Sequence, residues 1–135
     1  MNALYDAARE DFLKGLLDWS SDDIRPILVD AASYTVNLAL DGFLSDVPAG
    51  ARASTGTSLT GKTSTTGIAD ADDATFTAVP AGPACEAVVL YKHTGVEATS
   101  RLIAYIDDAT NLPITPNGGD ILVQWAATAN KIFKL

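Results

Sequence analysis

Residues 56–63 are the segment whose residue types and spacing most resemble a site for chemistry. They read GTSLTGKT and match the phosphate-binding loop pattern G-x-x-x-x-G-K-[ST] at every fixed position. In such a loop the backbone amides cradle phosphates, the lysine (Lys62 here) reaches their oxygens, and the hydroxyl (Thr63 here) binds magnesium. The loop must also follow a buried parallel strand and open a helix. Neither flank fits, because residues 48–55 are not a continuous apolar strand and residues 64–67 are poor helix formers. The string is therefore interpreted as a chance match, with nucleotide binding as a remote alternative.

Two further sets of residues suggest chemistry on a first reading. Asp70, Asp72 and Asp73 resemble part of a calcium loop, but the sequence lacks the flanking helices and the twelfth-position glutamate of that motif. A solvated acidic turn is expected instead. His93 is the only histidine, and no G-x-S-x-G nucleophile elbow accompanies it. We therefore expect no catalytic residue, no metal site and no cofactor, and a protein that is not an enzyme.

The composition describes one folded domain with an acidic surface. Of the 135 residues, 47% are hydrophobic and 19% are charged, which allows a real core and argues against intrinsic disorder. The formal net charge is −8. An acidic surface repels phosphate backbones and anionic lipids, so neither nucleic acid nor a membrane is an expected partner.

The compartment follows from what the sequence lacks. No apolar run approaches the roughly 20 residues that span a bilayer, and residues 1–6 lack the basic start of a signal peptide. Synthesis and folding in a cytoplasm are therefore expected. Cys85 is the only cysteine. It lies in an apolar stretch, so we expect a buried and inert thiol.

An amphipathic helix is predicted over residues 3–19. Tyr5, Phe12 and Trp19 fall close to one helical face, while charged residues occupy much of the remainder. Gly15 weakens this helix by about 1 kcal/mol relative to alanine. The prediction divides the chain into an N-terminal helical segment, residues 1–23, and a β domain, residues 24–135.

Short strands dominate the rest of the chain. They are predicted at residues 24–30, 74–79, 84–91, 102–106, 121–125 and 131–135. Residues 84–91 and 102–106 are apolar on both faces apart from Glu86, which is typical of central strands covered on both sides. Residues 121–125 alternate, so Trp125 is expected to anchor the core with Ile121 and Val123.

Three segments leave more than one interpretation. Pro26 cannot donate to a ladder, so an edge position or a strand start is expected there. Residues 35–46 could form a short helix capped by Thr35 or Asn37. Residues 51–66 fit either a flexible linker or edge strands around a turn at Gly61. Many short strands separated by glycine and proline turns predict a mainly β fold, a single compact β-sandwich or barrel-like domain with an N-terminal helix.

Several segments spread over most of the chain resemble a family of small structural proteins of tailed bacteriophages. They are residues 4–6 with 12–13, then residues 43–52, 59–62, 67–76, 89–92, 102–107 and 116–121. These motifs are structural rather than catalytic, so they specify a family better than a role. The resemblance implies that the phosphate-loop match at residues 56–63 is part of a strand–turn–strand of this family, which explains the match without a nucleotide.

The resemblance implies a virion protein made in the bacterial host cytoplasm. The role expected from it is a capsid decoration, or cement, protein on the outer capsid surface that binds major capsid protein subunits and stabilises the capsid. Self-association on the particle is also expected. The alternative is a tail or head–tail joining protein, which would have a similar composition.

The predicted N-terminal helix is the candidate for part of the partner contact. Tyr5, Phe12 and Trp19 are the residues expected at this interface, because one amphipathic helix is easily placed on a partner. An equally acceptable interpretation is that the same residues pack on the protein's own sheet.

Overall fold

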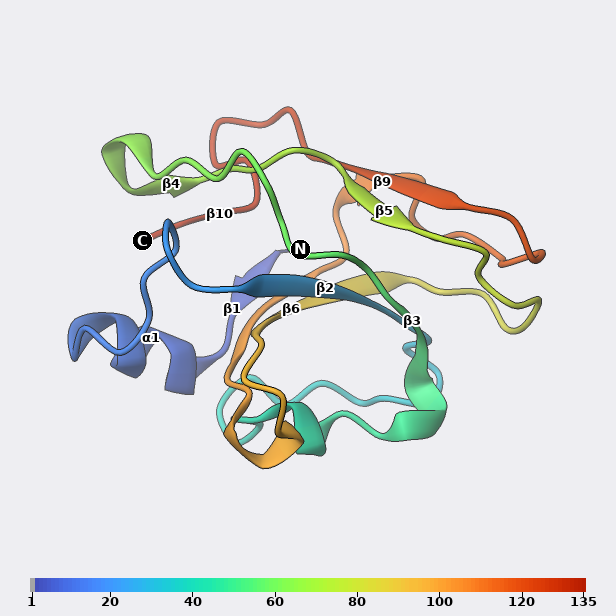
Figure 1. Cartoon of the computed structure of the whole chain (residues 1–135), viewed down its shortest axis with the longest axis horizontal. Coiled ribbons are helices and arrows are strands. Elements are labelled where there is room, and N and C mark those ends of the chain that lie inside the picture. Colours follow the sequence, from blue (N-terminus) through green and yellow to red (C-terminus); the bar gives the residue numbers. More distant parts are fainter. Residues whose placement is uncertain (1) are drawn as a thin grey trace.

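Two layers of β structure lie against each other in the computed structural model, which describes residues 2–135 (Figure 1). The strands are β1 (Ala3–Leu4), β2 (Ile24–Val29), β3 (Arg52–Thr55), β4 (Ile68–Ala69), β5 (Ala74–Phe76), β6 (Ala87–Lys92), β7 (Leu102–Ile106), β8 (Ala109–Thr110), β9 (Ile121–Trp125) and β10 (Phe133–Lys134). The helices are α1 (Asp6–Leu13) and the 3₁₀ turns η1 (Leu44–Asp46), η2 (Ala49–Ala51), η3 (Thr65–Gly67) and η4 (Glu97–Thr99). The fold is mainly β with one α-helix near the N-terminus, as predicted.

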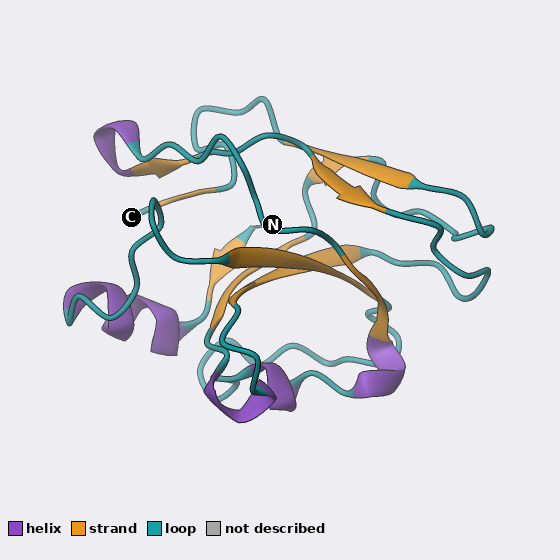
Figure 2. Ribbon diagram, in the orientation of Figure 1, coloured by secondary structure: helices purple, strands orange, loops and turns teal. Residues whose placement is uncertain are grey.

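The first layer is a five-stranded antiparallel sheet in the order β1-β7-β6-β2-β3. Nearly every residue of β2, β6 and β7 is buried. The reason is visible in Figure 2, where the second layer covers one face of this sheet, and the loops that carry η1, η2 and η4 cover the other. The prediction of central strands with both faces covered is therefore confirmed for β6 and β7.

Pro26 is the third residue of β2, an interior strand, so neither the edge position nor the strand start expected from its missing N–H is found. Its neighbour β3 ends at Thr55, opposite Ile27. The next residue, Gly56, donates its N–H to the carbonyl oxygen of Pro26 at 2.8 Å. A Cβ at Gly56 would lie only 2.7 Å from the Pro26 ring. The proline is tolerated because it faces the end of the β3 ladder, where a glycine makes room for its ring.

The second layer consists of the three-stranded sheet β5-β9-β8 and the pair β10-β4. Burial along β9 alternates, and Ile121, Val123 and Trp125 are the buried residues. The Trp125 indole also donates to the carbonyl oxygen of Asp72 at 2.9 Å. Trp125 is thus a core anchor, as predicted. The strands of residues 2–135 form three separate sheets that do not close into a barrel, which leaves the sandwich as the description of this fold.

The helix is shorter than the predicted span of residues 3–19. Residues 3–4 pair with β7 instead and add β1 to the sheet edge, so part of the 1–23 segment belongs to the β structure. At the other end, Gly15 adopts a φ of +71°. The N–H of Leu16 donates to the carbonyl oxygen of Asp11 at 2.8 Å, and the N–H of Gly15 donates to that of Phe12 at 3.3 Å. These two bonds make a Schellman cap, which ends the helix at Leu13, well before Trp19.

The two ambiguous segments are now defined. No α-helix forms within residues 35–46, where Leu40 is 81% exposed and η1 is the regular element that overlaps the segment. Residues 51–66 are not a linker, because β3 lies at the edge of the five-stranded sheet and Thr63 forms a bridge with Asp70. Gly61 makes the predicted turn with a φ of +61°. Among the helices of residues 2–135, none combines the length and apolar character needed to cross a bilayer.

Candidate interaction surface

The phosphate-loop string lies in a setting that differs from a phosphate site. It follows β3, an antiparallel edge strand, and it leads to the turn η3 instead of an α-helix. The Lys62 ammonium donates to the carbonyl oxygen of Asp22, and the Thr60 hydroxyl donates to the Asp72 carboxylate at 3.0 Å. These side chains fasten the loop to its neighbours, and the strand–loop–helix geometry that presents backbone amides to a phosphate is not formed.

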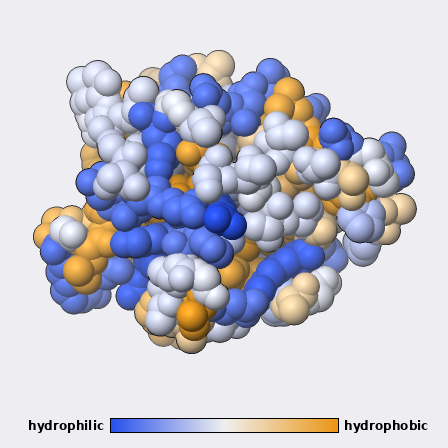
Figure 3. Space-filling model, viewed as in Figure 1, coloured by the Kyte–Doolittle hydropathy of each residue, from blue (hydrophilic) through white to orange (hydrophobic). Residues whose placement is uncertain are grey.

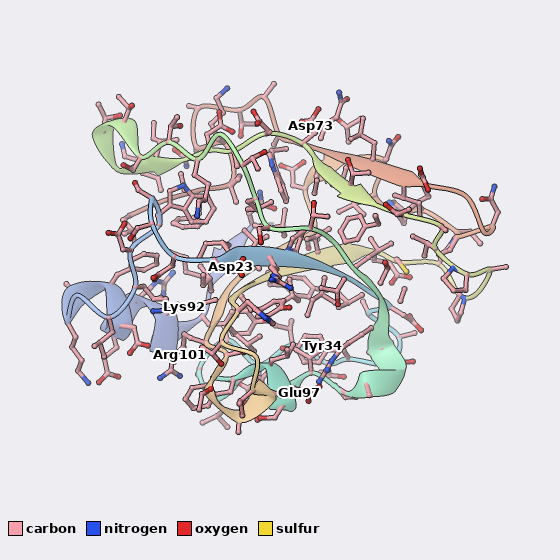
Figure 4. The ribbon with its side chains drawn as sticks, in the orientation of Figure 1. Asp23, Tyr34, Asp73, Lys92, Glu97 and Arg101 are labelled. Carbon is pink, nitrogen blue, oxygen red and sulfur yellow. The ribbon has the colours of Figure 1, made fainter. Side chains whose placement is uncertain are left out.

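The other candidate groups are dispersed. Within residues 2–135, no cluster of three or more metal-ligating side chains is present. Asp72 accepts from Thr60, Asp73 accepts from Gln124 at 3.4 Å, and Asp70 lies 3.8 Å from the Lys131 ammonium. Figure 4 shows Asp73 on the second layer and Asp23 near β2, on separate parts of the molecule. The acidic run therefore makes local contacts, each carboxylate with its own neighbour.

Cys85 and His93 both make contacts within the fold. The Cys85 thiol is completely buried, as predicted, and burial raises its pKa to about 11. A thiol with such a pKa stays protonated at neutral pH and is a poor nucleophile. The His93 ring lies edge-on to the Tyr91 ring, with centroids 6.1 Å apart. Its backbone N–H donates to the carbonyl oxygen of Asp23 at 2.8 Å, which fixes the end of β6.

Tyr5, one of the three expected interface residues, is completely buried. Its hydroxyl lies 2.9 Å from the Tyr34 hydroxyl, which donates to the Asp41 carboxylate at 2.7 Å. Burial is the main cause that raises the pKa of both phenols. This chain of hydrogen bonds ties the start of α1 to the loop beneath the sheet (Tyr34 is labelled in Figure 4). Tyr5 is therefore a core residue and cannot contact a partner in this conformation.

Trp19 also packs inside the protein, together with Phe12 and Phe133. The Trp19 and Phe133 rings meet edge-on with centroids 5.3 Å apart, and Phe12 lies 6.1 Å from Phe133. The Trp19 indole donates to the carbonyl oxygen of Asp70 at 3.3 Å. For Tyr5 and Trp19, packing on the protein's own sheet is thus the interpretation that holds. Phe12 is only partly buried, so it reaches the surface.

The exposed side of this aromatic cluster is an apolar surface between α1 and β10. A hollow of about 420 Å³ lies there. Its lining residues, which define the α1–β10 surface, are Leu4, Arg9, Phe12, Leu13, Lys134 and Leu135. Leu13 is 90% exposed and Leu135 is 60% exposed. In Figure 3, hydrophobic atoms gather over α1 at the left end of the molecule. Adjoining exposed leucines beside a hollow make this a candidate surface for a partner.

The charge of the α1–β10 surface is opposite to that of the protein as a whole. Most basic side chains are used internally, as in the ion pairs of Arg25 with Asp23 and Arg52 with Glu97. Arg9 pairs with Asp6 at 3.1 Å, but both side chains are more than half exposed, where such a pair is weak. The Lys134 ammonium has no ion-pair or hydrogen-bond partner within the described part of the chain. A partner at this surface therefore meets cations beside apolar side chains.

Two ion pairs hold the helical segment in place. The Arg101 guanidinium lies 2.7 Å from the Asp11 carboxylate and 4.1 Å from the centroid of the Phe43 ring. The Lys92 ammonium lies 3.2 Å from the Asp22 carboxylate and donates to the carbonyl oxygen of Leu16 at 3.1 Å. Figure 4 shows Arg101 and Lys92 beside α1. Because these pairs are partly buried, the helix presents Leu13 from a fixed position.

The sequence contains only a partial signal for this surface. Leu13 directly follows Phe12 of the predicted helical face, and the structure turns the Leu13 side chain outward. Nothing in the sequence pairs Leu13 with Leu135 or Lys134, which belong to the end of the chain that carries β10.

In comparisons with known proteins, the chain matches no protein-family model and no curated protein sequence.

Proposed function

We propose that this chain is a structural protein of a tailed-bacteriophage particle, which decorates the outer capsid and stabilises it by binding major capsid protein subunits. The resemblance of its motifs to small phage structural proteins supports the identity of the particle. The observation that carries the binding role is the α1–β10 surface, where two exposed leucines stand beside uncompensated positive charge.

The energetics of such a surface suit a multivalent partner. Full burial of one leucine side chain is worth about 1.5–3 kcal/mol, so Leu13 and Leu135 could give each copy only modest affinity. On a lattice, many copies and any contacts among neighbouring copies add to that affinity. A protein that binds only the mature lattice stabilises that state by mass action.

The test compares heads assembled with and without this protein. Heads that lack it are expected to be complete but to release DNA at a lower temperature or after chelator treatment. Purified protein added back should restore the release temperature. A cryo-EM map of restored heads should show density at regular lattice positions on the outer capsid surface.

A variant pair connects this assay to the surface. The double variant Leu13→Gln with Leu135→Gln should fail to restore the heads. Leu122→Gln is the control, because Leu122 is a 43% exposed leucine on β9, away from α1. Equal restoration by both variants would reject the α1–β10 surface as the contact. Density confined to the tail would favour a tail or head–tail joining role, and absence from purified particles would reject a virion role.

A further inference from the structure

Next to the α1–β10 surface, a groove separates β1 from β10. Its volume is about 440 Å³, and Leu4, Arg9 and Lys134 line both this groove and the neighbouring apolar hollow. The other lining residues are Asn2, Ala3, Asp108, Thr128, Asn130, Lys131, Ile132 and Phe133. The walls of the groove are therefore the edge strand of the five-stranded sheet and the edge of the β10-β4 pair.

Both walls present an open strand edge. In an antiparallel ladder, successive residues point their backbone N–H and C=O groups alternately toward and away from the paired strand. The N–H of Tyr5 donates to Ile103 of β7, so Leu4 directs its backbone groups away from β7. The N–H of Leu135 donates to Gly67, so Lys134 likewise directs its backbone groups away from β4. Leu4 and Lys134 line the same groove, each with ladder positions available.

One side chain bridges the two edges where a ladder could have formed. The Asn2 amide group donates to the carbonyl oxygen of Ile132 at 3.3 Å, and its oxygen accepts from the N–H of Asp108 at 3.0 Å. It also lies 3.5 Å from the carbonyl oxygen of Asp108. The bridge fixes β1 and β10 relative to each other without joining their backbones. The groove is thus held open by the fold.

The charges of the groove indicate what could enter it. Arg9, Lys131 and Lys134 contribute three cations, and Asp108 contributes one carboxylate. Arg9 also pairs with Asp6 at an exposed position, where water screens the pair, and the Lys131 ammonium lies 3.8 Å from the half-buried Asp70 carboxylate. In a chain with a net charge of −8, this is a locally basic slot beside an apolar hollow.

We propose that this groove binds an extended, acidic segment of a partner protein, which adds as a strand between β1 and β10. The open backbone groups of Leu4 and Lys134 would pair with the incoming strand, as in other cases of strand addition. Acidic side chains of the segment meet Arg9, Lys131 and Lys134. A large apolar side chain enters the hollow between Phe12 and Leu135. The proposal rests on the proposed function, in which this surface binds a protein.

The first experiment selects binders without assuming their sequence. A display library of random twelve-residue peptides is passed over the purified full chain. We expect enriched peptides to be acidic, with apolar residues at alternating positions. In the complex, hydrogen exchange at the amides of Leu4 and Lys134 should slow by at least ~10-fold, because each becomes a ladder bond.

Variants then separate charge, backbone pairing and fold. Lys134→Glu should weaken the selected peptides by about ten-fold, whereas Lys14→Glu, a reversal of a cation outside the groove, should leave affinity within about two-fold. Methylation of alternate backbone nitrogens in the peptide should weaken binding by at least ~5-fold. Near-identical amide spectra of the two protein variants would show that both are folded.

Several outcomes would overturn this inference. No enrichment, enrichment of basic or helix-forming peptides, or binding that ignores backbone methylation would each do so. A dimer of the protein alone that protects the amides of Leu4 and Lys134 would assign the groove to a second copy instead. Heads that bind the protein without competition from the selected peptide would reject the groove and keep the proposed function. If the protein binds the selected peptide but is absent from purified particles, the groove is kept as a binding site and the proposed function is rejected.

Discussion

The two layers of the sandwich are held together in different ways. In the five-stranded sheet, β2, β6 and β7 form long antiparallel ladders, and almost all of their side chains are buried. The second layer has shorter strands and depends on bonds from side chains to the backbone. The Trp125 indole donates to the Asp72 carbonyl oxygen, and the Asn111 amide donates to the Leu122 carbonyl oxygen. The Ala78 N–H donates to the Asp120 carboxylate.

This difference shows where backbone hydrogen-bonding groups remain unpaired and open to a partner. Where ladders are complete, the backbone has no hydrogen-bonding groups left for a partner. Where β1 and β10 approach without pairing, open edges, exposed leucines and a cation without a partner occur together. The five-stranded sheet therefore supplies stability, and the boundary between the layers is where we expect binding.

The largest expected effect is the loss of the anchor of the second layer. Trp125→Ala should lower the free energy of unfolding by ~3–5 kcal/mol, because it removes a large buried ring and leaves the Asp72 carbonyl without its donor. A reversible denaturant titration measures this. Leu122→Ala on the outer face of the same strand is the control and should cost under ~1 kcal/mol. A loss below ~1 kcal/mol for Trp125→Ala would show that the second layer does not depend on this ring.

The matching change in the first layer is Leu90→Ala. Leu90 is completely buried, on a strand paired on both sides, opposite Pro26 and Ala104. We expect a loss of about 3 kcal/mol, from lost burial and the cavity left behind. The ladders should persist, so amide protection across β6 and β7 should fall uniformly with the global stability. Selective loss of protection in β6 would contradict the view of this sheet as one cooperative unit.

Tyr34→Phe tests how much the hydrogen bonds between α1 and the loop beneath the five-stranded sheet stabilise the fold. This change removes the hydroxyl that donates to Asp41 and leaves the buried Tyr5 hydroxyl without its partner. An orphaned buried hydroxyl costs about 1–3 kcal/mol, so a loss of about 2 kcal/mol is expected in thermal or denaturant unfolding. Tyr105→Phe is the matched control, since its hydroxyl makes no hydrogen bond within residues 2–135. Equal losses in both variants would reject a structural role for the tyrosine pair.

Alkaline pH should weaken the fold through Cys85. Burial raises the pKa of this thiol to about 11 in the folded protein, above its value in the unfolded chain. The contribution is complete below the unfolded pKa of about 8.5 and is lost as pH rises toward the folded pKa. The free energy of unfolding should fall by about 1–2 kcal/mol between about pH 8 and pH 10. Cys85→Ala should reduce the slope between about pH 8 and pH 9.5, below the range in which the buried phenols of Tyr5 and Tyr34 add their own loss. An unchanged slope in the variant would assign the loss to other groups.

Periodicity explains which parts of the fold could be predicted. The alternation in β9 and the apolar runs of β6 and β7 each follow from whether one or both faces of a strand are covered, so these strands were predicted correctly. The end of α1 does not follow from helix propensity, by which Gly15 only weakens a helix. Its left-handed conformation makes it the cap. Pro26 was misplaced because the ladder beside it ends at Gly56, a tertiary fact.

The surface that we propose for binding was harder to predict than the fold. Residue spacing placed Tyr5, Phe12 and Trp19 on one helical face, and a face of that kind packs inward when a sheet is available. The hydrogen-bond partner of the buried Tyr5 hydroxyl is Tyr34, which lies on a loop that local patterns do not position. The α1–β10 surface brings Leu13 and Leu135 together from distant parts of the sequence. Only the folded chain shows that these two leucines adjoin.

The smallest expected effect on stability is that of Leu13→Gln, and it separates the binding surface from both layers. Leu13 is 90% exposed at the end of α1, so its side chain contributes little to the core. Leucine and glutamine have similar helix propensities, so the helix should be unaffected and the free energy of unfolding should change by less than ~0.5 kcal/mol. Binding to heads that lack the protein should nevertheless weaken by at least ~5-fold per copy, because about 1 kcal/mol or more of leucine burial is lost. Co-sedimentation with such heads measures the binding, and a denaturant titration of the same sample measures the stability. A variant that loses stability and binding together would make Leu13 a core residue, and a variant that keeps both would remove it from the contact.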